Sequence, residues 1–122
     1  MHHQPAYSAC TRHGSNIDVR EAWTPIFDRY GVDAVFAGHN HIYERSYPLN
    51  GGEAVSAGQG TTYIVTGGAG APLYVESDNE PFNLVANPIE HYIIADFGPD
   101  GADFVVRDLD DNIIDEFTIP AN

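Results

Sequence analysis

His39 and His41 are the residues whose type and spacing first indicate chemistry in this chain. They lie in the run GHNHIYER, residues 38–45, directly after the short apolar run 35–37. On an extended backbone, residues i and i+2 point to the same side, so both imidazoles can face one ion. Neutral imidazole is a common ligand of zinc and iron. The pair taken alone equally describes an exposed loop, so its surroundings must decide between the two interpretations.

A second histidine segment lies upstream, and the two segments together resemble a known family. The chain starts with MHHQPAYS, in which His3, Pro5 and Tyr7 form a His-x-Pro-x-Tyr pattern. An amphipathic helix and a hydrophobic strand that ends in GHNHIYERS follow it. This order resembles the C-terminal half of a purple acid phosphatase and, more broadly, the calcineurin-like metallophosphoesterases. The specific motifs run from His2 to about Leu49, and looser similarity covers residues 61–74.

The resemblance implies roles for four histidines. His3 and His39 would ligate the divalent ion of a dinuclear metal centre, and His41 would ligate the second ion, a ferric iron in purple acid phosphatases. His13 occupies the place of a family histidine that contacts the substrate phosphate or protonates the leaving group. That match rests on spacing alone, so a loop histidine without chemistry is an equal alternative for His13. We expect His3, His39 and His41 to converge, because neighbouring strand ends meet in a sheet.

The chain lacks the family's other ligand motifs and therefore resembles only part of a domain. An aspartate block, a Gly-Asp-x-x-Tyr segment with the bridging aspartate, and a Gly-Asn-His segment are all absent. Because a bridging carboxylate holds two metals about 3.5 to 4 Å apart, the three histidines are expected to bind at most one metal alone. The complete centre would hold iron with zinc, manganese or a second iron.

Length supports the same interpretation. A complete two-layer phosphoesterase needs roughly twice the 122 residues present here, so one sheet edge should be open. The expected partners are a phosphate ester substrate and the missing N-terminal half of the domain. The open edge also offers pairing with a second copy of the chain.

The charge balance excludes two classes of partner. The chain has 18 acidic and five basic residues and a net charge of −13. Such a charge repels nucleic acids and anionic membranes, and no apolar stretch is long enough to span a bilayer. It also repels phosphate at long range, so a phosphatase with this field needs metal ions for local positive charge. Family resemblance implies a secreted parent protein, whose signal peptide would lie upstream.

Periodicity predicts one helix followed mainly by strands. Ser15 with Asp18 is the expected N-cap and Gly31 the expected stop, while Pro25 predicts a kink or a restart capped by Thr24. The expected core-facing helix residues are Val19, Ala22, Trp23, Ile26, Phe27 and Tyr30. The expected strands are residues 33–37, 61–66, 91–97, 102–107 and 113–119. Residues 76–88 are interpreted as a surface excursion.

These elements predict the α/β class: a partial metallophosphoesterase β-sandwich with one amphipathic helix and a mainly β C-terminal part. Residues 1–75 would be the C-terminal part of the catalytic domain and residues 76–122 its β-rich extension. The glycines of residues 67–70 favour a tight turn over a phosphate cradle. Tyr43, Glu44 and Arg45 are assigned to support of the metal loop. His91 is interpreted as structural.

Two functions from different classes are compatible with the sequence. The first is the C-terminal portion of a metal-dependent phosphoesterase that hydrolyses phosphate esters at a dinuclear site, with metal-activated water as nucleophile and His13 as acid. This chain would supply about half of the metal ligands and be inactive alone. The alternative is a non-catalytic β-rich domain for metal binding or protein interaction.

Overall fold

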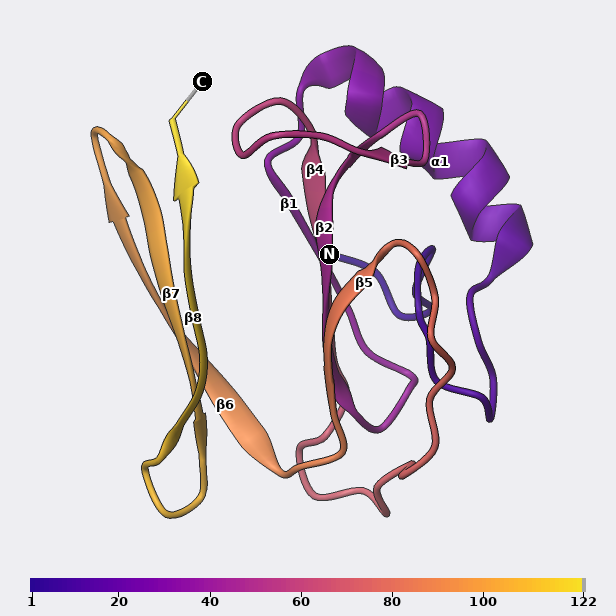
Figure 1. Cartoon of the computed structure of the whole chain (residues 1–122), viewed down its shortest axis with the longest axis vertical. Helices are drawn as coiled ribbons and strands as arrows, with labels where there is room; N and C mark the ends of the chain where they lie inside the picture. Colours follow the sequence, from indigo (N-terminus) through magenta and orange to yellow (C-terminus); the bar gives the residue numbers. More distant parts are fainter. Residues whose placement is uncertain (122) are drawn as a thin grey trace.

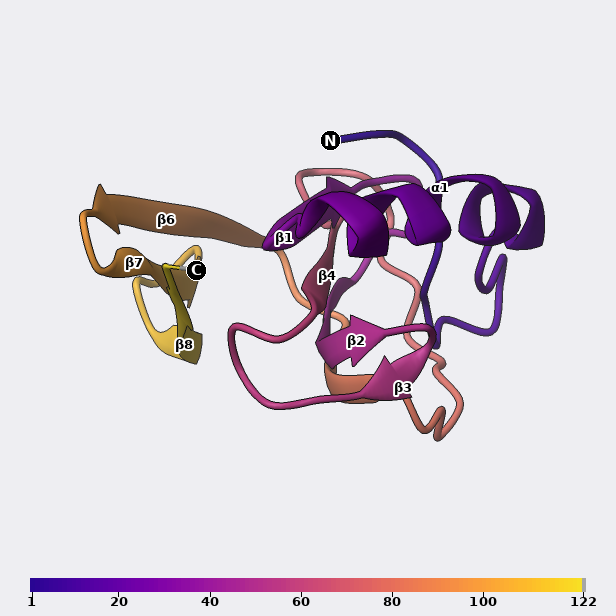
Figure 2. The ribbon, with the colours of Figure 1, turned by 90° about the horizontal axis from the view of Figure 1, so that it is seen from above.

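The computed structural model describes residues 1–121, which form one helix and two β-sheets arranged in layers (Figure 1). Helix α1 (Ile17–Tyr30) covers one face of the larger sheet, and the smaller sheet packs on the other (Figure 2). The larger sheet contains β1 (Ala34–Ala37), β2 (Tyr43–Asn50), β3 (Glu53–Ala54), β4 (Thr61–Thr66) and β5 (Asn83–Asn87). The smaller sheet contains β6 (His91–Gly98), β7 (Gly101–Asp108) and β8 (Ile113–Pro120). The prediction of one helix and a mainly β remainder is confirmed.

The larger sheet has a parallel edge and an antiparallel remainder. Its order is β1-β4-β2, and β3 and β5 both pair with the far side of β2. Strands β1 and β4 run parallel, as two strands separated by a long connection can. The smaller sheet is an antiparallel β6-β7-β8 meander. Among the described residues, the outer side of β1 carries only a parallel bridge between His2 and Ala37.

Helix α1 is continuous, and its N-cap lies one residue later than the predicted cap, Ser15. Asn16 is the N-cap, and its side-chain oxygen accepts from the backbone N–H of Val19 at 2.9 Å. Pro25 lies inside the helix, and the predicted restart at Thr24 is wrong because the Thr24 hydroxyl bonds back to the Arg20 carbonyl. Gly31 ends the helix in the left-handed conformation, as predicted. Within the described residues, no helix is long and apolar enough to cross a membrane.

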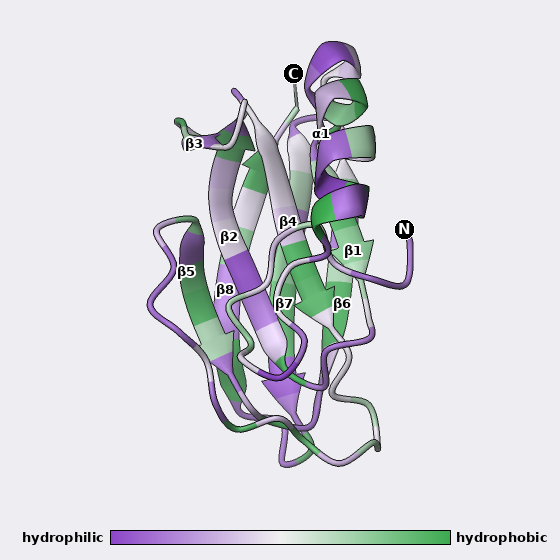
Figure 3. Cartoon of the chain, turned by 90° about the vertical axis from the view of Figure 1, so that its right-hand side faces the viewer, coloured by the Kyte–Doolittle hydropathy of each residue, from purple (hydrophilic) through white to green (hydrophobic). Residues whose placement is uncertain are grey.

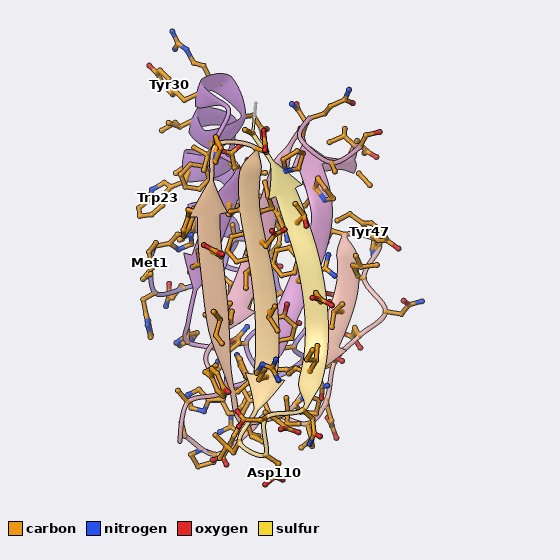
Figure 4. The ribbon with its side chains drawn as sticks, turned by 90° about the vertical axis from the view of Figure 1, so that its left-hand side faces the viewer. Met1, Trp23, Tyr30, Tyr47 and Asp110 are labelled. Carbon is orange, nitrogen blue, oxygen red and sulfur yellow. The ribbon has the colours of Figure 1, made fainter. Side chains whose placement is uncertain are left out.

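Only part of the predicted apolar helix face is buried. Val19 and Phe27 pack against a core that includes Tyr7. Trp23, Ile26 and Tyr30 are 43%, 53% and 71% exposed, so their prediction as core residues is wrong for the described chain. Figure 4 shows Trp23 and Tyr30 projecting from α1 on the edge where Met1 also lies. An apolar stripe therefore remains open to solvent beside the β1 edge.

The predicted strands are present, but three others, β2, the two-residue β3 and β5, were not predicted. The predicted β1, β4 and the three strands of the smaller sheet are found within one residue of their expected bounds. Strand β2, with the sequence YERSYPLN, is polar, and Figure 3 shows a hydrophilic band across it. Strand β5 lies inside the segment interpreted as a surface excursion. Strands β2 and β5 pair with each other, and β2 also pairs with β3 and β4, so tertiary pairing rather than apolar alternation defines them.

Alternation along β2 divides the residues predicted to support the metal loop. Tyr43 and Arg45 point toward the smaller sheet, where both bond to the carboxylate of Asp115 on β8 at 2.6 to 2.9 Å. The Arg45 guanidinium also lies 4.4 Å from the centre of the Phe117 ring. Glu44 alone points to the opposite face. The support role predicted for Tyr43 and Arg45 is therefore replaced by a link between the two sheets.

Replacing Asp115 with alanine is expected to lower the free energy of unfolding by roughly 2 to 4 kcal/mol, because it leaves the Arg45 cation without a partner. The side chains of Arg45 and Asp115 are only 13% and 9% exposed. Burial opposes ionisation of Asp115, but its bonds from Arg45 and Tyr43 outweigh burial and hold its pKa below 3.8. The contribution of the Asp115–Arg45 pair to stability is thus fully present above pH 3.8, and it is lost as the pH falls through the lowered pKa of Asp115. Denaturant unfolding of Asp115→Ala measures this loss, and Asp96→Ala, which changes an exposed aspartate, is the control. Equal losses of unfolding free energy in the two variants would contradict the prediction.

Candidate metal centre

The first residues of the chain place His3 beside the second histidine loop. The backbone N–H of His2 donates to the Phe36 carbonyl at 3.1 Å, and the N–H of Gly38 donates to the His3 carbonyl at 3.0 Å. These bonds extend the sheet beyond β1 in the parallel direction. His3 is therefore anchored, through backbone bonds, at the end of β1 where the GHNH sequence begins.

His39 adopts a left-handed backbone conformation, with φ of 64°. The prediction of an extended backbone that presents His39 and His41 to the same side is therefore wrong. Gly38 is not among the glycines with positive φ, and a Cβ there would stand 3.8 Å from the His3 ring. The sharp turn is thus made at His39, at a cost of roughly 1 to 3 kcal/mol for a residue other than glycine.

His3 and His39 present their ring nitrogens to each other. His3 Nε2 and His39 Nδ1 are 3.1 Å apart, and the ring planes are inclined by 73°. Two nitrogens bound to the same ion at about 2.0 to 2.1 Å lie roughly 2.9 to 3.3 Å from each other. Both the spacing and the donor chemistry therefore fit two ligands of one transition metal ion.

The ionisation of His39 favours the ligand form. Burial lowers its pKa first, and charge on His13, His3 and His41 lowers it further. A lowered pKa keeps the imidazole neutral, and only the neutral ring offers a lone pair to a metal. The cluster of histidines thus supports its own ligand state.

His41 is oriented by residues that come after the glycine-rich segment. Its Nδ1 lies 2.8 Å from the Pro72 carbonyl oxygen, and its ring stacks on Tyr74 with a centroid distance of 4.3 Å. Because a carbonyl only accepts, Nδ1 carries the proton and Nε2 is the free lone pair. In residues 1–121, no three histidine, cysteine or acidic side chains form a metal-binding group. The convergence of His41 with the His3–His39 pair therefore stays a prediction.

His13 lies against the same cluster and borders a cavity. Its ring centroid is 4.6 Å from that of His39 and 5.5 Å from that of Tyr74. A cavity of about 370 Å³ is lined by His13, His39, Gln4 and the residues that begin α1. His13 is an exposed turn residue that borders a cavity beside the candidate metal ligands, and its role stays a prediction.

Gly67 brings the end of β4 against the histidine loop. A Cβ on Gly67 would lie 2.1 Å from the carbonyl oxygen of Asn40, a distance that atoms do not adopt. Gly67 is therefore required because the backbone of Asn40 passes close to it. The sequence predicted a tight turn here but not this close approach. Sequence reasoning missed Pro72 and Tyr74 as partners of His41. The only sequence signal for Pro72 and Tyr74 was the Gly67-Gly68 pair that precedes them. Glycines in such a pair allow close backbone approach, which brings the residues that follow near the histidine loop.

Comparison with known proteins places these motifs in a family. An acid phosphatase of Aspergillus ficuum is 34% identical over 93 residues, covering 66% of this chain and 14% of that protein. Purple acid phosphatase 15 of Arabidopsis thaliana is 34% identical over 80 residues, covering 65% of this chain and 15% of that protein. The chain is homologous to part of the purple acid phosphatases. The resemblance predicted from the histidine motifs is confirmed.

A solved structure shows that the fold is also that of a purple acid phosphatase. The purple acid phosphatase PPD1 of yellow lupin (Lupinus luteus) matches 97% of this chain with a TM-score of 0.81 and 23% identity. The match covers 24% of the lupin chain. The chain thus folds like part of a purple acid phosphatase, a family that uses dinuclear metal centres. It spans about one seventh of the length of these curated relatives. No protein-family model matches the chain.

Proposed function

We propose that this chain is part of the catalytic domain of a metal-dependent phosphoesterase that hydrolyses phosphate esters at a dinuclear centre. His3 and His39 would hold the divalent ion and His41 the second ion, an iron, with zinc, manganese or iron as the divalent partner. The parent protein would be secreted, as proposed from the family resemblance. The observation that carries the proposal is the 3.1 Å approach of His3 Nε2 to His39 Nδ1, two nitrogens contributed by separate motifs.

The positions of the described residues support a separate role for each candidate histidine. When bound, the metal ions would polarise the phosphoryl oxygens and activate the attacking water. His3 and His39 present ring nitrogens that lie 3.1 Å apart, and the carbonyl of Pro72 fixes the tautomer of His41. His13, at the wall of the cavity, would donate a proton to the leaving oxygen. The net charge of −13 opposes phosphate binding at long range, so the local charge of the site must overcome it.

The open β1 edge supports the proposed partner, a polypeptide that supplies the remaining ligands. The outer side of β1 carries the bridge to His2, so its other backbone groups face outward. Both ring nitrogens of His2 are buried without a hydrogen-bond partner among residues 1–121. Trp23 and, on the β6 edge, Phe97 are 43% and 76% exposed. A strand docked on β1 would pair its backbone and cover apolar side chains of both layers.

The alternative function is a non-catalytic metal-binding or interaction domain. Its support is the open β1 edge with the exposed Trp23 beside it, a surface on which another polypeptide can dock. Turnover separates the two proposals, because a non-catalytic domain stays inactive whatever polypeptide is added to it.

Zinc binding tests the site in the chain as it exists. Equilibrium dialysis is expected to give at most one Zn²⁺ per chain, because three histidines without a bridging carboxylate cannot hold a second ion. His39→Ala should weaken that binding at least about 10-fold, since it removes a ligand outright. His13→Ala is the matched control and should leave zinc content intact. Two ions per chain, or equal binding by wild type and His39→Ala, would contradict the proposal.

A further inference from the structure

The side chain of Asn40 connects the two loops that carry the candidate metal and proton-transfer histidines. Asn40 lies between His39 and His41 and is fully buried. Its Nδ2 donates to Ser8 Oγ at 2.7 Å and to the Gly14 carbonyl oxygen at 3.1 Å. Because the Gly14 carbonyl only accepts, the amide nitrogen must be the atom that faces it. One amide group therefore bonds to both ends of the segment 8–14.

Glu44 completes this network from strand β2. Its carboxylate accepts from Ser8 Oγ at 2.5 Å and from the backbone N–H of Ala9 at 2.8 Å, and the side chain is 2% exposed. Burial raises the pKa of Glu44, while its bonds from Ser8 and Ala9 act in the opposite direction. The Ser8 hydroxyl accepts from Asn40 and donates to Glu44. Two segments distant in sequence, residues 8–14 and residues 40–44, thus share one buried network.

The network is better suited to positioning than to stability. Asn40 Oδ1 is buried and has no hydrogen-bond partner among the described residues. A buried acceptor without a partner costs about 1 to 3 kcal/mol, which offsets much of what the two bonds donated by the amide contribute to stability. The amide instead fixes the position of two backbone segments. Asn40 comes directly after His39, whose φ is 64°, and its amide bonds to Gly14, the neighbour of His13.

We propose that Asn40 is a positioning residue that holds His39 in its left-handed conformation and locks the His13 loop against it. The 4.6 Å contact between the two rings is then a product of the Asn40 network. The chemical meaning of this contact rests on the proposed phosphoesterase function, in which His39 is a ligand and His13 serves the leaving group.

The test compares Asn40→Ala and Asn40→Asp with Thr61→Val in the metal-free chain. Thr61 is 1% exposed and donates to the Val32 carbonyl at 2.7 Å, so its variant also loses a buried hydrogen bond, but away from the histidines. The ring contact between His13 and His39, followed by nuclear Overhauser effects, should be lost in both Asn40 variants and kept in Thr61→Val. Should the Asn40 variants fail to fold, Ser8→Ala removes one hydroxyl from the network and should lose the same contact. A retained contact overturns the inference.

Cobalt binding provides the second readout and separates the two proposals. Co²⁺ affinity is expected to fall about 10- to 100-fold in Asn40→Ala, the usual effect of losing a group that orients a ligand. Thr61→Val should bind Co²⁺ like wild type at temperatures where both are folded. Equal affinity of Asn40→Ala and wild type would overturn the positioning role. A wild-type chain that does not bind Co²⁺ would contradict the proposed metal site, while the ring contact still decides the inference.

Discussion

Replacing His13 with alanine is expected to lower the turnover of an alkyl phosphate by ~10² to 10⁴ when the chain is joined to the missing half of its domain. His13 lies against His39 and borders the cavity, so it can reach a leaving oxygen placed there. An alkoxide leaves poorly without a proton, which makes the rate depend on a general acid. Metal content should be unchanged, because the His3–His39 pair does not include His13.

The leaving group distinguishes the roles open to His13. A general acid matters little for para-nitrophenyl phosphate, whose leaving phenolate needs little protonation, so the loss should be much smaller with that substrate. A histidine that only contacts the phosphate would lower both rates by the same factor. Steady-state kinetics with both esters therefore give the role directly. Unchanged rates with both substrates would return His13 to the interpretation as a loop histidine without chemistry.

Elements with strong local signals could be predicted from sequence. The β-branched and aromatic run Thr61–Thr66 and the Pro99-Asp100-Gly101 turn are local signals for strands, and both are found. Strand β2 could not be predicted in this way. Its polar residues bond on opposite faces of the sheet: Arg45 bonds to Asp115, and Glu44 bonds to the segment 8–14. Such partners lie some 35 or 70 positions away in sequence, beyond any local pattern.

The site was predictable in composition but not in geometry. The motifs identified His3 and His39, and the structure brings their ring nitrogens together. The left-handed backbone of His39 could not be predicted, because tertiary contacts such as the approach of Gly67 to Asn40 accompany a conformation that local preference disfavours. The exposed face of Trp23 was also mispredicted, since periodicity shows that a face is apolar but not whether a partner covers it.

The central claim is that this chain provides about half of a dinuclear phosphoesterase site. Its three candidate ligands lack a bridging carboxylate, so the paired stabilisation of attacking and leaving oxygens is incomplete. Supplying the rest of the domain should therefore raise turnover by at least about 10³-fold, given that losing even one charge-stabilising group costs about 10² to 10³. The rest of the domain would be the half of a purple acid phosphatase that carries the aspartate and Asn-His ligands, added in trans or by fusion.

The most direct measurement is para-nitrophenyl phosphate turnover, with zinc and iron supplied, for the isolated chain and for the completed domain. The isolated chain is expected to hydrolyse the ester no faster than a His39→Ala, His41→Ala double variant. The completed domain should be active, and the same double substitution should abolish that activity. Robust turnover by the isolated chain that disappears in the double variant would show that this chain is a complete catalyst and contradict the account, as would a completed domain that loads both metals and stays inactive.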